Sequence, residues 1–88
     1  MKKFETGKIY TTDSMNFWAR IEIIKMTDCY VTYKIFGDQG DNKIRRAKIR
    51  TFNRYGKKMH GILVCSMYDF TGYHKTRIYD MCYANDEV

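Results

Sequence analysis

The stretch that decides the fold is Cys29–Asn53, which reads CYVTYKIFGDQGDNKIRRAKIRTFN. Its first part places the apolar side chains of Val31, Tyr33 and Ile35 at alternate positions, and this period of two is typical of a half-buried β-strand. The next six residues, 37–42, are all loop-forming and predict the turn of a hairpin. We therefore expect two antiparallel strands here, with the return strand running from residue 43 to about 53.

Further short strands are expected on both sides of this hairpin. Residues 4–12 predict a first strand, and a longer strand begins near Asn16. In that longer strand the apolar parity changes after Ile23, which predicts a β-bulge near Ile23–Ile24. Residues 59–67 include Ile62–Cys65, a run that is apolar on both parities and so predicts the most buried strand.

The C-terminal residues give a weaker signal. After Asp69 we expect a short strand or a helix of one to two turns that caps the fold, and residues 85–88 are expected to fray. The 88 residues suffice for one hydrophobic core, so residues 1–88 are predicted to form a single domain. The predicted fold class is mainly β, a small five-stranded antiparallel barrel that is SH3-like or, as the alternative, OB-like.

Positive charge is concentrated in one segment. The whole chain has a formal net charge of +6, yet residues 43–58 hold eight basic and no acidic side chains, and the rest of the chain is slightly acidic. On a regular return strand Arg46, Lys48 and Arg50 would emerge on one face, roughly 7 Å apart. Phe52 would continue this row as a platform for base stacking. The cations of the candidate binding surface are completed by Arg54, Lys57 and Lys58.

Three interpretations of this basic segment remain open. It can bind nucleic acid, since such local fields attract polyanions. It can bind an acidic protein surface. It can also be a solvated outer face that prevents pairing between strand edges. Trp18 and Arg20 form a second candidate contact, because Trp and Arg are enriched at binding hot spots. The alternative for Trp18 is partial cover by the C-terminal segment.

The sequence favours a binding protein over an enzyme. His60 and His74 have no metal-ligand spacing around them, and we find no nucleophile–base pair, carboxylate pair or glycine-rich phosphate loop. We therefore expect no cofactor and no metal. The three cysteines, an odd and widely spaced set, predict reduced thiols in a cytoplasmic protein. No apolar stretch approaches the roughly 18–20 residues of a membrane span, so no membrane partner is expected.

Three short motifs carry a resemblance. They are the N-terminal Phe4-x-x-Gly7-Lys8-x-Tyr10, then Val31-Thr32-Tyr33, and finally Ile44-Arg45-Arg46-x-Lys48-Ile49. In these motifs the chain resembles small β-rich proteins of Firmicutes phages and integrative elements, a group that includes anti-CRISPR inhibitors. The resemblance implies a cytoplasmic, non-enzymatic protein that blocks or modulates a host nucleoprotein. The resemblance does not identify any binding residues in this chain, because such inhibitors share no common motif.

Two functions are therefore predicted. The first is a basic, non-enzymatic binding module that engages nucleic acid or a nucleoprotein complex. The alternative is a mobile-element inhibitor of the anti-CRISPR type, which docks onto a CRISPR effector or another host defence protein. The sequence does not distinguish DNA from RNA and gives no oligomeric state.

Overall fold

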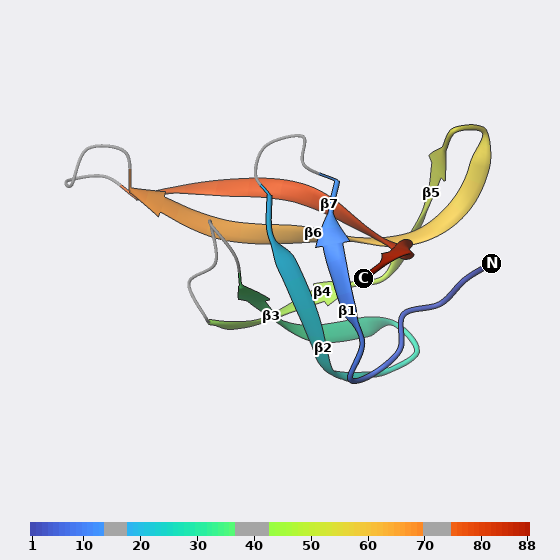
Figure 1. Ribbon diagram of the computed structural model, residues 1–88, viewed down its shortest axis with the longest axis horizontal. Helices are drawn as coiled ribbons and strands as arrows, with labels where there is room; N and C mark the ends of the chain where they lie inside the picture. Colours follow the sequence, from blue (N-terminus) through green and yellow to red (C-terminus); the bar gives the residue numbers. More distant parts are fainter. Residues whose placement is uncertain (14–17, 37–42, 70–74) are drawn as a thin grey trace.

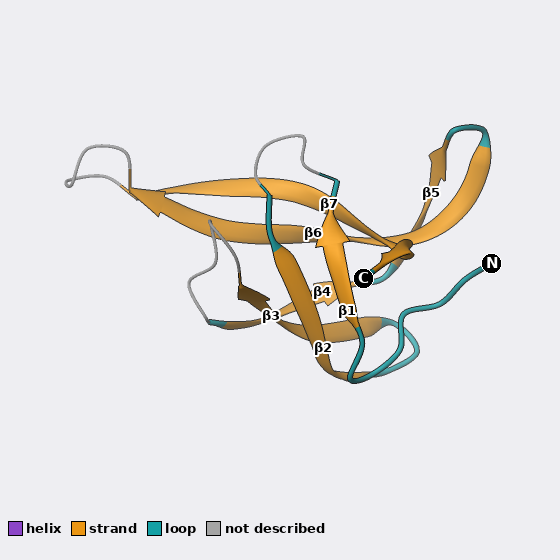
Figure 2. Ribbon diagram, viewed as in Figure 1, coloured by secondary structure: helices purple, strands orange, loops and turns teal. Residues whose placement is uncertain are grey.

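The computed structural model describes residues 1–13, 18–36, 43–69 and 75–88, with residues 66–69, 75 and 76 described by their backbone alone. These residues form strands and turns, and no helix occurs among them (Figure 2). The strands are β1 (Ile9–Thr12), β2 (Arg20–Met26), β3 (Tyr30–Phe36), β4 (Ile44–Lys48), β5 (Arg50–Arg54), β6 (Lys57–Asp69) and β7 (Lys75–Glu87). The mainly β class is confirmed.

The strands form one antiparallel sheet in the order β4-β3-β2-β1-β7-β6-β5. The sheet curls into a half-barrel, so that β4 lies below the long β6–β7 hairpin in Figure 1, and the Cα atoms of β4 and β6 come within 8 Å of one another. The predicted five-stranded SH3-like or OB-like barrel is therefore wrong, because the sheet has seven strands and forms a half-barrel. Two departures from the expected pattern account for the difference.

The first departure is a break in the predicted return strand at Ile49. Strand β4 pairs with β3 as far as Lys48, which lies opposite Tyr30. Strand β5 then pairs with β6, where Arg50 lies opposite Gly61. Between the two strands, the Ile49 N–H donates to the Cys29 carbonyl at 2.7 Å. The chain thus passes from β4 at one end of the sheet to β5 at the other end. The prediction of one continuous strand over residues 43–53 is therefore wrong.

The second departure is the C-terminal segment, which is a thirteen-residue strand inside the sheet, between β1 and β6. Strand β7 pairs with β6 from Lys75 to Tyr83 and with β1 through Tyr10 and Thr12. The expected frayed tail is wrong, since Glu87 lies opposite Tyr10 and the Val88 N–H donates to the Ile9 carbonyl at 2.9 Å. The alternation of β7 was hard to recognise because one of its core-facing positions is Asp80.

Strand β2 contains the expected bulge. Ile23 lies opposite Tyr33 and Lys25 opposite Thr32, so Ile24 is the extra residue. The bulge keeps Ile21 and Ile23 fully buried while Ile24 is 39% exposed. This is the behaviour that the change of parity predicted.

The core is built from the inward positions of both halves of the sheet. Val31, Ile35, Ile62 and Val64 are fully buried, as their apolar patterns predicted. Ala47 and Ile49 pack against the core from partly exposed positions. Near the N-terminus, the rings of Phe4 and Tyr10 meet edge to face with their centroids 4.9 Å apart. The other buried apolar residues are Ala19, Ile21, Ile23, Tyr33, Cys82, Tyr83 and Ala84.

The β5–β6 hairpin turns through Tyr55 and Gly56. Both residues have positive φ, 53° and 75°. Two positive φ values fit a two-residue turn whose twist matches that of the flanking strands. This turn holds Lys57 and Lys58 at the tip of the hairpin.

Two further expectations concern disulfides and membrane-spanning segments. No disulfide links Cys29, Cys65 and Cys82, all of which lie in the described part of the chain. Within the described residues, no helix has the length and apolar character needed to cross a membrane.

Candidate functional site

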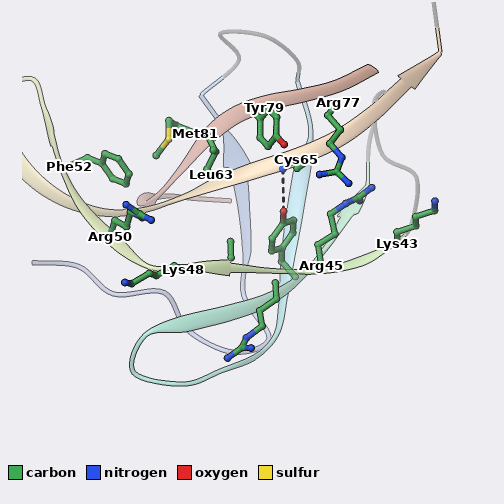
Figure 3. Close-up of a pocket in the computed structure, with 13 residues that line it drawn as sticks. Lys43, Arg45, Lys48, Arg50, Phe52, Leu63, Cys65, Arg77, Tyr79 and Met81 are labelled. Carbon is green, nitrogen blue, oxygen red and sulfur yellow. Dashed lines mark hydrogen bonds between the residues drawn. The ribbon is translucent and has the colours of Figure 1, made fainter. Parts of the chain in front are cut away.

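An open groove of about 960 Å³ lies between β4–β5 and the face of β6–β7 that points away from the core. Figure 3 shows its side chains projecting from both sides. The lining residues are Tyr33, Lys43, Arg45, Arg46, Ala47, Lys48, Arg50, Phe52, Leu63, Cys65, Arg77, Tyr79 and Met81. The groove combines a row of cations with an apolar and aromatic floor.

The floor follows from the alternation of side chains along β6 and β7. Leu63 lies opposite Met81 and Cys65 opposite Tyr79, so these four side chains share one face of the hairpin. The neighbouring positions, including Ile62 and Val64, face the core. Leu63 is 50% exposed and Tyr79 40% exposed. The prediction that 62–65 form the most buried strand is therefore wrong in part, because its two apolar faces serve the core and the groove.

Six basic residues line the groove, and none of the described lining residues is acidic. They come from distant parts of the chain, since Lys43, Arg45, Arg46 and Lys48 lie in or next to β4, Arg50 lies on β5 and Arg77 on β7. In Figure 3 the side chain of Arg45 extends from β4 toward that of Arg77. In the described part of the chain no carboxylate forms an ion pair with Lys48, Arg50 or Arg77. A concave surface of one charge sign concentrates the electrostatic field.

The predicted row of Arg46, Lys48 and Arg50 is not a row on one strand. Arg50 belongs to β5, and β4 ends at Lys48. All three side chains are exposed, as expected. Arg45, which had no assigned role, lies opposite the inward-facing Tyr33 and so points into the groove. The break at Ile49 thus replaces one straight row with a curved cationic wall.

Arg46 also lines a second, smaller cleft on the outer face of the sheet. Its guanidinium carbon lies 4.0 Å from the centroid of the Tyr30 ring. This outer cleft has a volume of about 390 Å³ and is lined by Lys25, Met26, Thr27, Tyr30, Thr32 and Arg46. Strand β4 therefore separates two basic concavities.

Phe52 is half-buried at one end of the groove. Its ring meets that of Tyr83 edge to face, with centroids 6.3 Å apart. A Cβ atom built on Gly61 would lie 3.1 Å from Cδ2 of Phe52, so the ring lies directly over this glycine. Phe52 thus lines the groove, and one side of its ring is held by packing.

Arg54 is a structural residue. Its Nη1 donates to both carboxylate oxygens of Asp86 at 2.9 and 3.0 Å, and its Nη2 donates to Oδ1 of Asp13 at 2.6 Å. Its guanidinium carbon lies 4.4 Å from the ring centroid of Tyr83. Burial alone would lower the pKa of Arg54, but the hydrogen bonds and charge of Asp86, with the charge of Asp13, raise it above its ordinary value. Both terminal nitrogens of Arg54 are held by carboxylates and its side chain does not line the groove, so Arg54 contributes no cation there.

The remaining candidates lie outside both concavities. Lys57 and Lys58 are exposed at the hairpin tip. Trp18 is 44% exposed, and the guanidinium carbon of Arg20 lies 5.6 Å from its ring centroid. Trp18 and Arg20 thus form an exposed pair, but the structure does not bring them to the groove.

Nine of the thirteen groove residues were not among the predicted site residues: Tyr33, Lys43, Arg45, Ala47, Leu63, Cys65, Arg77, Tyr79 and Met81. Period-two alternation gave no signal for the three residues of β7, because the run 77–82 (RIYDMC) does not alternate between polar and apolar side chains. The described residues contain no cluster of three or more metal-ligating side chains, and His74 lies outside them.

Comparisons with protein-family models, with curated proteins and with solved structures found no match to this chain.

Proposed function

We propose that this chain is a non-enzymatic binding module that engages nucleic acid through the groove. One observation carries the proposal: six basic side chains converge on one open groove of about 960 Å³ whose described lining has no acidic residue and includes exposed aromatic and apolar side chains. Phosphates supply the charge that such a wall attracts, and bases supply flat apolar faces for the floor.

The cations and the floor would have separate roles. Lys48, Arg50 and Arg77 carry charges that no ion pair within the described residues neutralises. Each cation that meets a phosphate releases condensed counterions, and this release drives binding at low salt. Tyr79 and Phe52 offer ring surfaces to a base, which adds affinity with little dependence on sequence.

An extended acidic peptide is a less suitable occupant of the groove. Such peptides commonly bind by adding a strand to a sheet edge. Neighbouring strands lie about 4.8 Å apart, so a strand inserted between β4 and β6 would need the two to be about 9–10 Å apart. Their Cα atoms come within 8 Å, and the Cys65 N–H on the β6 edge already donates to the Tyr33 hydroxyl. Recognition must therefore use side chains, which favours nucleic acid.

The test is binding of labelled oligonucleotides over a salt series, with two matched triple variants. The groove variant is Lys48→Glu with Arg50→Glu and Arg77→Glu. The control is Lys3→Glu with Lys57→Glu and Lys58→Glu, which makes the same change in net charge at exposed positions outside the groove. For a single strand, losing three phosphate contacts should reduce the slope of log K against log[salt] by about two units.

The control should keep most of the affinity and slope of the unmodified protein. Both variants should keep their melting temperatures, because exposed substitutions usually change stability by less than about 0.5 kcal/mol each. Equal loss of affinity in the two variants would show that net charge alone acts, and would sink the proposed role of the groove.

The mobile-element inhibitor stays a second proposal, which has only the resemblance of the three motifs behind it. It predicts that the chain captures a host protein from a lysate after complete nuclease digestion. Its complex should also depend weakly on salt, because a protein interface with an apolar centre is less sensitive to ionic strength than phosphate binding.

A further inference from the structure

Strand β4 is a narrow cationic rim between two concavities. Arg45 lies opposite Tyr33 and faces the groove, whereas Arg46 lies opposite Thr32 and faces the outer side of the sheet. Lys48 lies opposite Tyr30, on the same outer side. Arg46 and Lys48 nevertheless also line the groove. Positive charge thus extends from the groove to the outer cleft across the edge of β4. In the described part of the chain this edge pairs with no strand.

The outer cleft has the groups that recognise an unpaired base. The Arg46 guanidinium lies 4.0 Å from the Tyr30 ring centroid, so the cation and the ring are held together. Unpaired bases stack on aromatic rings and on arginine guanidinium planes. Lys25 in the same cleft adds a further cation.

The backbone around Tyr30 is fixed before any ligand arrives. The Tyr30 N–H donates to the Thr27 hydroxyl at 3.1 Å, and the Thr27 N–H donates to the Tyr30 carbonyl at 2.8 Å. The Cys29 N–H also donates to the Thr27 hydroxyl, at 3.3 Å. Because this backbone is already ordered, binding of a ligand costs less conformational entropy.

We infer that the ligand of this protein is a single strand that crosses the β4 edge and occupies the groove and the outer cleft at once. This inference rests on the proposed function and names its substrate class. A duplex cannot take this path, because DNA has a persistence length of about 150 base pairs and does not fold around the edge of one strand. Its bases are also paired and stacked, so they cannot lie on Tyr79 and Tyr30.

The experiment uses thymidine oligonucleotides of about 4 to 16 nucleotides and a 16-base-pair duplex, a range that covers the site sizes of small β-barrel modules. The outer-cleft variants are Tyr30→Ala and, because the half-buried Tyr30 can affect folding, Arg46→Gln at an exposed position. The control is Trp18→Ala, which removes an aromatic ring that is 44% exposed and lines neither concavity. Melting temperatures establish that each variant is folded.

For the shortest oligonucleotides, which can fill only one concavity, Tyr30→Ala should bind as the unmodified protein does. For the longest, Tyr30→Ala should bind about 5- to 150-fold more weakly, the equivalent of roughly 1–3 kcal/mol for one stacked base. Arg46→Gln also removes a cation from the groove, so it should weaken binding at every length, and most for the longest oligonucleotides. Trp18→Ala should weaken binding at no length.

The failures of the two proposals are distinguishable. If the unmodified protein binds no oligonucleotide at low salt, the proposed function fails. If it binds, but Tyr30→Ala leaves the affinity unchanged at every length and Arg46→Gln weakens long and short oligonucleotides equally, the function stands and the path across β4 is overturned. A duplex that binds as tightly as the single strand would also overturn the inference.

Discussion

The hydroxyl of Tyr33 on β3 accepts a hydrogen bond from the backbone N–H of Cys65 on β6, at 3.2 Å (Figure 3). These two strands lie on opposite halves of the sheet, with β2, β1 and β7 between them. The bond therefore connects the halves across the mouth of the curl, where no strand pairs within the described residues. This hydrogen bond fixes the distance between the two walls of the groove.

Replacing Tyr33 by Phe should loosen this connection. The ring stays in the core, but the Cys65 N–H loses its acceptor, so the free energy of unfolding should fall by about 1 kcal/mol. Denaturant unfolding gives this value. Amide exchange should quicken at Cys65 more than at Ile62 or Val64. An equal increase in the amide exchange rates along β6 would show that the Tyr33 hydroxyl does not act locally at Cys65.

Gly61 is a second position that controls the groove. An added Cβ would lie 3.1 Å from the Phe52 ring, 3.2 Å from that of Tyr83 and 3.3 Å from the Cys82 carbonyl. Gly61→Ala should therefore displace Phe52 and destabilise the fold by roughly 1–3 kcal/mol, as overpacking does. Thermal unfolding measures the cost. Phe52→Leu combined with Gly61→Ala should recover stability, and failure to recover it would place the strain on the Tyr83 ring or the Cys82 carbonyl.

The strands that could be predicted from the sequence are those in which apolar and polar side chains alternate because one face is buried in the core. In β2 and β3 the apolar residues face the core and the polar ones face solvent, so the period of two and even the bulge near Ile23 were visible. Strand β7 was not recognised as a long strand. Its inward positions include the small Ala84 and the acidic Asp80, while its outward positions include Tyr79 and Met81. This reverses the usual contrast between faces.

The site was predicted in part for a related reason. The charge of segment 43–58 was evident, but its arrangement depends on the break at Ile49, where one hydrogen bond to the Cys29 carbonyl redirects the chain. Neither that bond nor the partners of Arg54 can be derived from local pattern, because Asp13 and Asp86 are far away in the sequence. Long-range pairing decided which cations face the groove.

Arg54 and Arg50 should therefore give opposite phenotypes, although they lie four residues apart. Arg54→Ala leaves Asp13 and Asp86 without their shared cation, whose side chain is only 16% exposed, and should cost about 2–3 kcal/mol. Arg50→Ala, at an exposed position, should stay within about 0.5 kcal/mol but reduce the salt slope of oligonucleotide binding. Chemical unfolding and binding at a temperature where both variants are folded make the comparison. A stable Arg54→Ala variant with a reduced slope would contradict the structural role.

The fold should lose stability in alkali because of Cys82. Burial raises the pKa of this thiol far above its ordinary value of 9.0, and its Sγ donates to the Thr11 carbonyl at 3.3 Å. Above pH 9 the unfolded chain therefore loses a proton that the folded chain keeps, so unfolding releases a proton and its free energy falls as pH rises. The loss should be about 1 kcal/mol between pH 9 and 10.

Above pH 10 two tyrosines should steepen this loss, because burial also raises the pKa values of Tyr10 and Tyr83 above 10.0. Unfolding in urea at a series of pH values from 7 to 11 gives the profile. Cys82→Ser removes the titrating thiol while a hydroxyl can still donate to Thr11, so its decline should begin nearer pH 10. If the variant and the unmodified protein decline together from pH 9, another group governs the alkaline limb and Cys82 does not.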